Sequence, residues 1–273
     1  MKKRVIKLSS LLIPFHTFLV FLAGFLLALT IMFKIDADYT EELFDQLGKH
    51  ILAEAQANHD NVEQTVVRAM HTTYSMQRVN KENLFQYSPQ SFKAKYMRST
   101  DLDLLDVTGA CGSASLVLAR TYMAMGFPTR IGQMYANGHY AGHMVVEVWS
   151  NGRWMVMDPL FDQAFYKPDS TLASFTEVQH NFAHYATQLH PNYPKEYQYK
   201  GVRYTNWEKF PILSPLLKQL MVWHFGQTRT EQFCIRKYFI RFHQVWFYVF
   251  LSLFIGVAGV LVVQWRMKKN HKK

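Results

Sequence analysis

The sequence has very little cysteine: Cys111 and Cys234 are the only two among 273 residues. This number excludes the dense disulfide framework of a small secreted scaffold. No Cys/His quartet accompanies them, which argues against a structural zinc site. His139 and His143 have the spacing of a helical metal pair, but they fall in a predicted loop and strand. We therefore predict neither a metal nor a cofactor.

The chain also lacks internal repeats, low-complexity tracts and, between its two ends, any clear excess of positive charge. The formal net charge is +10, and nine basic residues in the tails supply all but one unit of it, since 21 Lys and Arg face 20 Asp and Glu without them. A nucleic-acid surface needs a clustered basic patch, so we predict no nucleic-acid partner. The nine residues are Lys2, Lys3, Arg4, Lys7, Arg266, Lys268, Lys269, Lys272 and Lys273.

What the chain does have is two long apolar runs without formal charge. "LLIPFHTFLVFLAGFLLALTIMF" covers residues 11–33, and "QVWFYVFLSLFIGVAGVLVVQW" covers residues 244–265. About 20 apolar residues suffice to cross a bilayer, so we predict transmembrane helices over 11–33 and 243–265, with the lipid bilayer as a partner. The alternative for the first run is a cleaved signal peptide, but the run exceeds the usual ~7–15 apolar residues and no clear cleavage site follows.

The basic tails predict the orientation, because positive charge favours the cytoplasmic side. Residues 1–10 and 266–273 are then cytoplasmic tails, and residues 34–242 form an extracytoplasmic domain, periplasmic in a Gram-negative inner membrane. Basic residues before the second span weaken this orientation without reversing it. About 209 residues are ample for one domain with its own core.

Hydrophobic periodicity predicts two helices between residues 39 and 77 and a third after Cys111. The third is apolar nearly all round, which indicates a buried central helix. Short runs rich in β-branched and aromatic residues follow and predict an antiparallel sheet. Farther along we predict a helix near 172–189, a hairpin at 197–207 and a helix near 215–225.

The dipeptide Asn151-Gly152 is a strong signal for a two-residue hairpin turn. Such a turn places Val145 opposite Asp158. His143 then lies diagonally from Asp158 on the same face, at roughly 7–8 Å between backbones and within side-chain reach. The alternate residues form the core face of the hairpin and are Met144, Val146, Val148, Met155 and Met157.

Cys111 begins the predicted buried helix among small residues. A helix N-terminus stabilises a thiolate, and a neighbouring imidazolium lowers the thiol pKa further. Gly109 and Gly112 leave room for a substrate carbonyl, and N–H groups at the helix start would stabilise an oxyanion. Together with the His143 and Asp158 pair, these residues predict acyl transfer through a thioester, on the hypothesis that the helix packs against the hairpin.

Other fates of the thiol stay open. A disulfide from Cys111 to Cys234, a merely packed thiol and a zinc ligand are the alternatives. Two structural pairs are also expected: an ion pair between Glu147 and Arg130, and a cross-strand contact between Trp149 and Trp154.

The order of these motifs resembles the core of the transglutaminase-like superfamily of papain-like cysteine enzymes, in a membrane-anchored bacterial-type form. The resemblance covers about 50 residues and implies an α+β fold in which a buried Cys helix packs on an antiparallel sheet. It implies Cys111 as nucleophile, His143 as general base and acid, and Asp158 as the residue that orients His143. Met144 and Val145 stand where relatives carry a small residue and an aromatic one, so the cleft wall there differs. The matching pieces are a G-x-C turn, "GFPTR", "HMVVEV" and "WMVMDP", at 109–111, 126–130, 143–148 and 154–159.

These inferences predict a membrane-tethered cysteine enzyme with a Cys-His-Asp triad on the outer side of the membrane. It would act on amide or acyl groups of a protein, peptide or other envelope substrate, as a peptidase, amidase or transamidase. Hydrolysis is preferred because water is the abundant acceptor. The alternative is a catalytically silent transglutaminase-like domain that serves as a scaffold in an envelope assembly.

Overall fold

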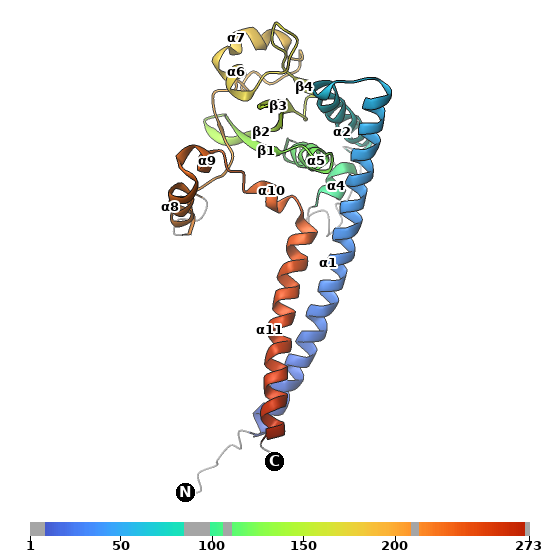
Figure 1. Cartoon of the computed structure of the whole chain (residues 1–273), viewed down its shortest axis with the longest axis vertical. Coiled ribbons are helices and arrows are strands. Elements are labelled where there is room, and N and C mark those ends of the chain that lie inside the picture. Colours follow the sequence, from blue (N-terminus) through green and yellow to red (C-terminus); the bar gives the residue numbers. More distant parts are fainter. Residues whose placement is uncertain (1–8, 85–98, 106–110, 209–212, 271–273) are drawn as a thin grey trace. The chain divides into compact units, whose positions relative to one another are not determined.

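The structure is a computed structural model of the chain and describes residues 9–84, 99–105, 111–208 and 213–270 (Figure 1). The chain divides into two compact units. One comprises Met1–Tyr39 with Phe242–Lys273, and the other comprises Thr40–Arg241. Each unit is described by itself. Residues 1–8 and 271–273 of the two predicted tails lie outside the described residues.

The smaller unit contains two helices that are long and apolar enough to cross a membrane, as the sequence predicts. They are the first part of α1 (Ser9–Ala57) and α11 (Phe242–Asn270). His16 Nδ1 lies 3.1 Å from Gln264 Oε1, and the ring of Phe33 stacks on Phe250 at 5.3 Å between centroids. The start of one helix therefore packs against the end of the other, and the two run antiparallel. The two helices support a membrane protein with two spans.

Helix α1 continues without a break from the predicted span into the larger unit. The acidic segment after the span contains neither glycine nor proline, and Lys34 pairs with Asp38 one turn later, with 2.6 Å between the charged atoms. Such i,i+4 pairs support a helix. The helix ends only where His59 adopts a left-handed backbone with φ 57°. Helix α2 (Val62–Leu84) follows, capped by the Asn61 side chain, which accepts the Gln64 N–H at 3.0 Å.

The larger unit is built on a five-stranded antiparallel sheet in the order β4-β3-β2-β1-β5. Helix α4 (Thr100–Leu105) and helix α5 (Cys111–Ala124) precede it in the chain. The strands are β1 (Thr129–Ala136), β2 (His139–Ser150), β3 (Arg153–Asp158), β4 (Gln163–Ala164) and β5 (Val202–Arg203).

The turn between β2 and β3 has the predicted geometry. Asn151 and Gly152 both have positive φ, 50° and 76°, as a two-residue type I′ turn requires. The paired residues run from Ser150 opposite Arg153 to Val146 opposite Met157, one residue before the end of β3. The hairpin register expected from the sequence is therefore confirmed.

A bulge interrupts β2 immediately before His143. Met134 pairs with His143 while Tyr135 pairs with Tyr140, so Ala141 and Gly142 have no partner on β1. A Cβ on Gly142 would lie 2.6 Å from the backbone oxygen of Ala136, closer than real contacts allow. Bulges re-aim side chains near active sites, and this one requires glycine because no side chain fits.

Each face of the sheet is covered by a separate hydrophobic cluster. The face expected to be core packs against α5 and α2, through Met144, Val146, Val148, Met155 and Met157. Val145 and Val156 on the opposite face pack against the segment after β4, which supplies many aromatic side chains. Figure 1 shows α5 on one side of the sheet and α6 and α7 on the other. The sheet is thus buried on both faces, in an α+β fold.

The segment after the sheet differs in part from expectation. The predicted helix at 172–189 is broken into α6 (Phe175–His180), α7 (Phe182–Tyr185) and the 3₁₀ helix η1 (Ala186–Gln188), because Asn181 leaves helical geometry with φ −131° and ψ 48°. The predicted hairpin at 197–207 is wrong, because β5 in this segment pairs with β1. A sequence pattern typical of a strand does not identify the strand with which it pairs.

The helix expected near 215–225 is present as α8 (Leu213–Phe225). Two short helices, α9 (Gln227–Glu231) and α10 (Arg236–Phe239), lead from it to α11.

Candidate active site

Cys111 is the first residue of α5 and is half-buried. The helix is tied to the His143 strand because the Ser115 hydroxyl donates to the Met144 carbonyl at 3.1 Å. Farther along, the Tyr122 hydroxyl donates to the Val66 carbonyl of α2 at 2.9 Å. Both donors are fully buried, so these hydrogen bonds fix the helix against the sheet with little solvent competition. The hypothesis that the Cys helix packs on the hairpin is confirmed.

His143 and Asp158 form a hydrogen-bonded ion pair that is completely buried. Nε2 of His143 lies 2.6 Å from Oδ2 of Asp158, and both side chains are 0% exposed. Burial by itself lowers the pKa of His143, but the charge of Asp158 and the hydrogen bond to it prevail and raise that pKa to about 9. The imidazole is therefore held as an imidazolium near neutral pH.

The other ring nitrogen, Nδ1 of His143, is buried and has no hydrogen-bond partner among the described residues. The Cys111 thiol nevertheless interacts with the ring, because each group shifts the pKa of the other. Burial raises the pKa of Cys111, but hydrogen bonding to His143 and its charge outweigh burial, and the thiol pKa lies below its ordinary value. Catalytic hydrogen bonds are often long in the absence of substrate.

Asp158 is held by groups that the sequence analysis did not identify. The Tyr193 hydroxyl donates to Oδ2 of Asp158 at 2.6 Å, and it lies 3.2 Å from the Tyr199 hydroxyl. The Leu160 N–H donates to the other carboxylate oxygen at 3.2 Å. These donors hold the carboxylate in a fixed orientation beside His143.

Aromatic rings enclose His143. Tyr197 stacks on the imidazole with 4.1 Å between centroids and 14° between planes, and Phe161 lies at 5.8 Å. Burial and the nearby charge of Cys111 raise the pKa of Tyr197, so its hydroxyl stays neutral. The sequence offers one sign of this cluster, the tyrosine-rich stretch "PNYPKEYQY" at 191–199, but its distance from His143 along the chain gives no reason to connect them.

The two glycines expected to give room to a substrate have different outcomes. Gly109 lies outside the described residues. Gly112 has space around it, since an added Cβ would lie 3.9 Å from the Met144 sulfur, an ordinary contact. The fold alone does not require glycine at this position.

The other pairs predicted from the sequence are present. The Arg130 Nε donates to Glu147 Oε2 at 2.9 Å, in a buried ion pair that also receives the Tyr204 hydroxyl. Trp149 and Trp154 meet edge to face at 5.3 Å. These contacts stabilise the sheet away from the His143 end.

The disulfide alternative is wrong, since Cys111 and Cys234 are both free. Cys234 is buried beside β1, where its sulfur accepts the Ile131 N–H at 3.4 Å. Among the described residues no cluster of three or more His, Cys, Asp or Glu side chains is arranged to hold a metal ion.

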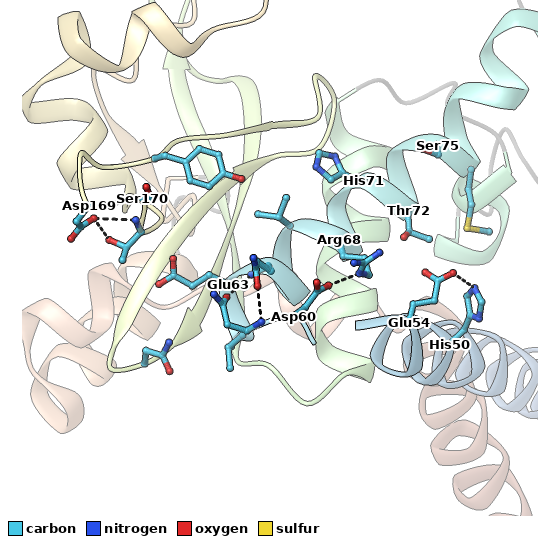
Figure 2. A pocket seen from close by; sticks show the side chains of 18 residues that line it. His50, Glu54, Asp60, Glu63, Arg68, His71, Thr72, Ser75, Asp169 and Ser170 are labelled. Atoms are coloured by element: carbon cyan, nitrogen blue, oxygen red, sulfur yellow. Dashed lines mark hydrogen bonds and ion pairs between the residues drawn. The ribbon is translucent and has the colours of Figure 1, made fainter. Parts of the chain in front are cut away.

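A broad pocket of about 1090 Å³ lies between the end of α1, α2 and the loop after β4, and neither Cys111, His143 nor Asp158 lines it (Figure 2). Its charged side chains are largely paired, either with one another or with side chains beside the pocket. Arg68 Nε lies 2.6 Å from Asp60 Oδ2, and His71 Nδ1 lies 2.6 Å from Asp162 Oδ1. Because these charges are already paired, the pocket gives no clear signature of a charged ligand.

One comparison with known proteins identifies the domain. The family model "Transglutaminase-like superfamily" matches residues 49–159, a range that includes Cys111, His143 and Asp158. No curated protein and no solved structure gives a significant match. The matched range ends one residue after Asp158, so the tyrosines around the pair lie beyond it. The chain therefore contains a transglutaminase-like domain, as the resemblance of its motifs implies.

Proposed function

We propose that this protein is a membrane-tethered cysteine enzyme that cleaves or transfers amide-linked acyl groups through a thioester at Cys111. The observation that carries the proposal is the buried pair of His143 and Asp158, coupled to a thiol at the start of a helix. Strongly perturbed pKa values from burial and a specific partner are typical of functional sites. Superfamily membership supports cysteine chemistry and leaves the reaction to be tested.

In the first half-reaction the Cys111 thiolate attacks the substrate carbonyl carbon, and a C–S bond forms while the carbonyl oxygen becomes an oxyanion. The backbone N–H of Cys111 belongs to the first turn of α5, where N–H groups typically lack a helical acceptor. It is therefore our candidate oxyanion donor. The His143 imidazolium then gives its proton to the leaving amine, the C–N bond breaks, and a thioester remains.

In the second half-reaction water or another amine attacks the thioester carbonyl. Neutral His143 takes the proton of the attacking group, the C–S bond breaks, and the thiolate and imidazolium return. Asp158 stays ionised throughout and balances the charge on the ring. Hydrolysis of a peptide or amide bond is the preferred outcome, since water is the abundant acceptor.

The scaffold alternative is not favoured, because the three residues that the chemistry needs are all retained. A thiol-reactive probe that mimics an amide tests this directly on the full chain in detergent. We expect labelling to disappear in Cys111→Ser and to fall by several orders of magnitude in His143→Ala, since removing one member of a triad costs about 10⁴-fold or more in rate.

The matched control is Cys234→Ser, since Cys234 is the other cysteine of the chain and is buried away from the triad. This variant should label as fast as the native chain. Equal labelling of native and His143→Ala protein would contradict the activated thiolate and leave a merely packed thiol.

For location, we propose that both termini are cytoplasmic and that the catalytic domain faces outward. The antiparallel packing of α1 and α11 supports termini on one side, and the basic tails favour the cytoplasmic side. A reporter fused after residue 273 should be active in the cytoplasm. An external signal would overturn the orientation without affecting the chemistry proposed for Cys111.

A further inference from the structure

Helix α8 (Leu213–Phe225) has a continuous apolar face that nothing in the described part of the chain covers. Trp223 is 84% exposed and Leu213 is 67% exposed, and only Ser214 of this helix is buried. The exposed apolar residues recur at intervals of three and four, which places them on one side of a helix. They are Leu213, Leu216, Leu217, Leu220 and Trp223. Lys218 and Gln219 lie away from the centre of this face.

Leaving such a face in water is unfavourable. Each square ångström of apolar surface removed from water is worth about 25 cal/mol, and soluble proteins rarely expose large contiguous apolar patches unless the patch is an interaction site. The face should therefore be covered in the working protein.

The chain itself indicates which surface is available. Only 16 residues separate Phe225, the end of α8, from Phe242, the start of the second candidate span. Even fully extended, this connection reaches no more than about 58 Å, and two short helices shorten it further. The end of helix α8 is thus tethered within that distance of the bilayer that the span is expected to cross.

The composition of this region also fits lipid. Between Leu213 and Arg241 the only acidic residue is Glu231, while Tyr238 and Phe239 of α10 are 55% and 60% exposed. Tryptophan, tyrosine and basic side chains together are typical of a helix that lies in the headgroup region. The basic residues are Lys218, Arg229, Arg236, Lys237 and Arg241.

We propose that α8 is an interfacial helix whose leucine and tryptophan face inserts into the headgroup–acyl boundary of the membrane. The catalytic domain is then held at the bilayer by a surface contact as well as by its spans. This inference does not depend on the chemistry of Cys111.

The test compares two neighbouring positions on α8 in the full chain, reconstituted as one copy per lipid nanodisc. A spin label is attached at Leu217→Cys or, as the matched control, at Lys218→Cys, in a background of Cys111→Ser and Cys234→Ala. We expect the ratio of oxygen to nickel-chelate accessibility to be several-fold higher at 217 than at 218, and the difference to grow when phosphatidylglycerol replaces phosphatidylcholine.

Equal nickel accessibility at the two positions would show that the face lies in water and would overturn the proposal. Shielding of position 217 from both reagents would also overturn it, because protein would then cover the face.

A second measurement leaves both cysteines in place, in case the background weakens folding. Lipids brominated near the headgroup quench tryptophans at that depth, including those of the second span. We expect the quenched fraction of the fluorescence to fall in Trp223→Phe. If the total fluorescence intensity lost to the brominated lipids were the same in the native chain and in Trp223→Phe, Trp223 would not contact lipid and the proposal would be wrong.

Discussion

Two His–Asp pairs in the larger unit share the same 2.6 Å separation but have very different surroundings. His143 and Asp158 are both 0% exposed, whereas the side chains of His71 and Asp162 are 54% and 24% exposed. In both pairs the carboxylate raises the histidine pKa. Distance and residue type therefore do not distinguish a buried pair from a surface ion pair.

The two pairs differ in the groups that surround each carboxylate and each histidine. Asp158 also accepts hydrogen bonds from Tyr193 and Leu160, and its histidine is stacked by an aromatic ring and coupled to a thiol. His71 lies at the wall of an open pocket, where solvent screens its pair with Asp162. Burial therefore strengthens the interaction between His143 and Asp158. Solvent screening leaves the pair of His71 and Asp162 with only a small contribution to stability.

The largest expected difference is in stability. His143→Ala leaves the Asp158 charge buried without its main partner, so we expect the free energy of unfolding to fall by ~3–5 kcal/mol. His71→Ala, its matched control, should cost less than ~1 kcal/mol. Denaturant unfolding of the full chain measures both. Similar losses in the two variants would mean that burial does not separate the pairs.

The bulge before His143 provides the next largest effect. In Gly142→Ala the new Cβ meets the Ala136 backbone, so we expect a loss of ~1–3 kcal/mol together with slower Cys111 labelling, since His143 is displaced. Gly112→Ala is the control, because its Cβ has room. It should leave stability unchanged or raise it by up to ~1 kcal/mol, since alanine favours a helix. Slower labelling in Gly112→Ala alone would support a role for Gly112 in substrate clearance.

A smaller change is expected from Tyr193→Phe, which removes one hydroxyl and keeps the ring. Because that hydroxyl holds Asp158, we expect the rate of Cys111 labelling to fall about tenfold, equivalent to about 1.4 kcal/mol. Tyr199→Phe removes the next hydroxyl of the chain and should have a weaker effect. An unchanged rate in Tyr193→Phe would show that His143 alone suffices to position the carboxylate.

The smallest effect is a shift in pH dependence. For the native chain, turnover of an amide substrate should rise with pH as the thiol ionises, below the ordinary thiol range, and fall as His143 loses its proton near pH 9. Asp158→Asn keeps a hydrogen-bond acceptor but removes the charge that raises the His143 pKa, so the alkaline limb should move to lower pH. If the alkaline limb did not move in Asp158→Asn, a group other than His143 would be responsible for it. The apparent pKa values of the two limbs describe the coupled pair of Cys111 and His143 together.

Much of the region that contains Cys111, His143 and Asp158 could be predicted from local signals. The Asn151-Gly152 turn sets the hairpin register, and strict alternation along β2 and β3 places His143 and Asp158 on one face. The buried helix after Cys111 follows from its uniformly apolar sequence. These features depend on short-range geometry, which residue order specifies directly.

The covering of the site could not be predicted in the same way. Tyr193, Tyr197 and Tyr199 lie at least 35 residues beyond Asp158 in a segment without regular periodicity. A strand pattern was visible at 197–207, but its pairing with β1 was not. Long-range contacts of irregular segments depend on which surfaces the rest of the fold leaves open.

By itself, the sequence determined the two long apolar helices, because a long run of apolar residues is a local property of the chain. It also determined the hairpin and the approach of His143 to Asp158, because the two-residue turn fixes the register of the strands. Only the tertiary structure decided that the pair of His143 and Asp158 is buried and that a tyrosine hydroxyl donates a hydrogen bond to Asp158. It also decided that Cys111 lies close enough to His143 for each to influence the other's pKa. Burial is the physical reason: it strengthens the interaction of His143 with Asp158, and it depends on segments that meet only in the folded chain.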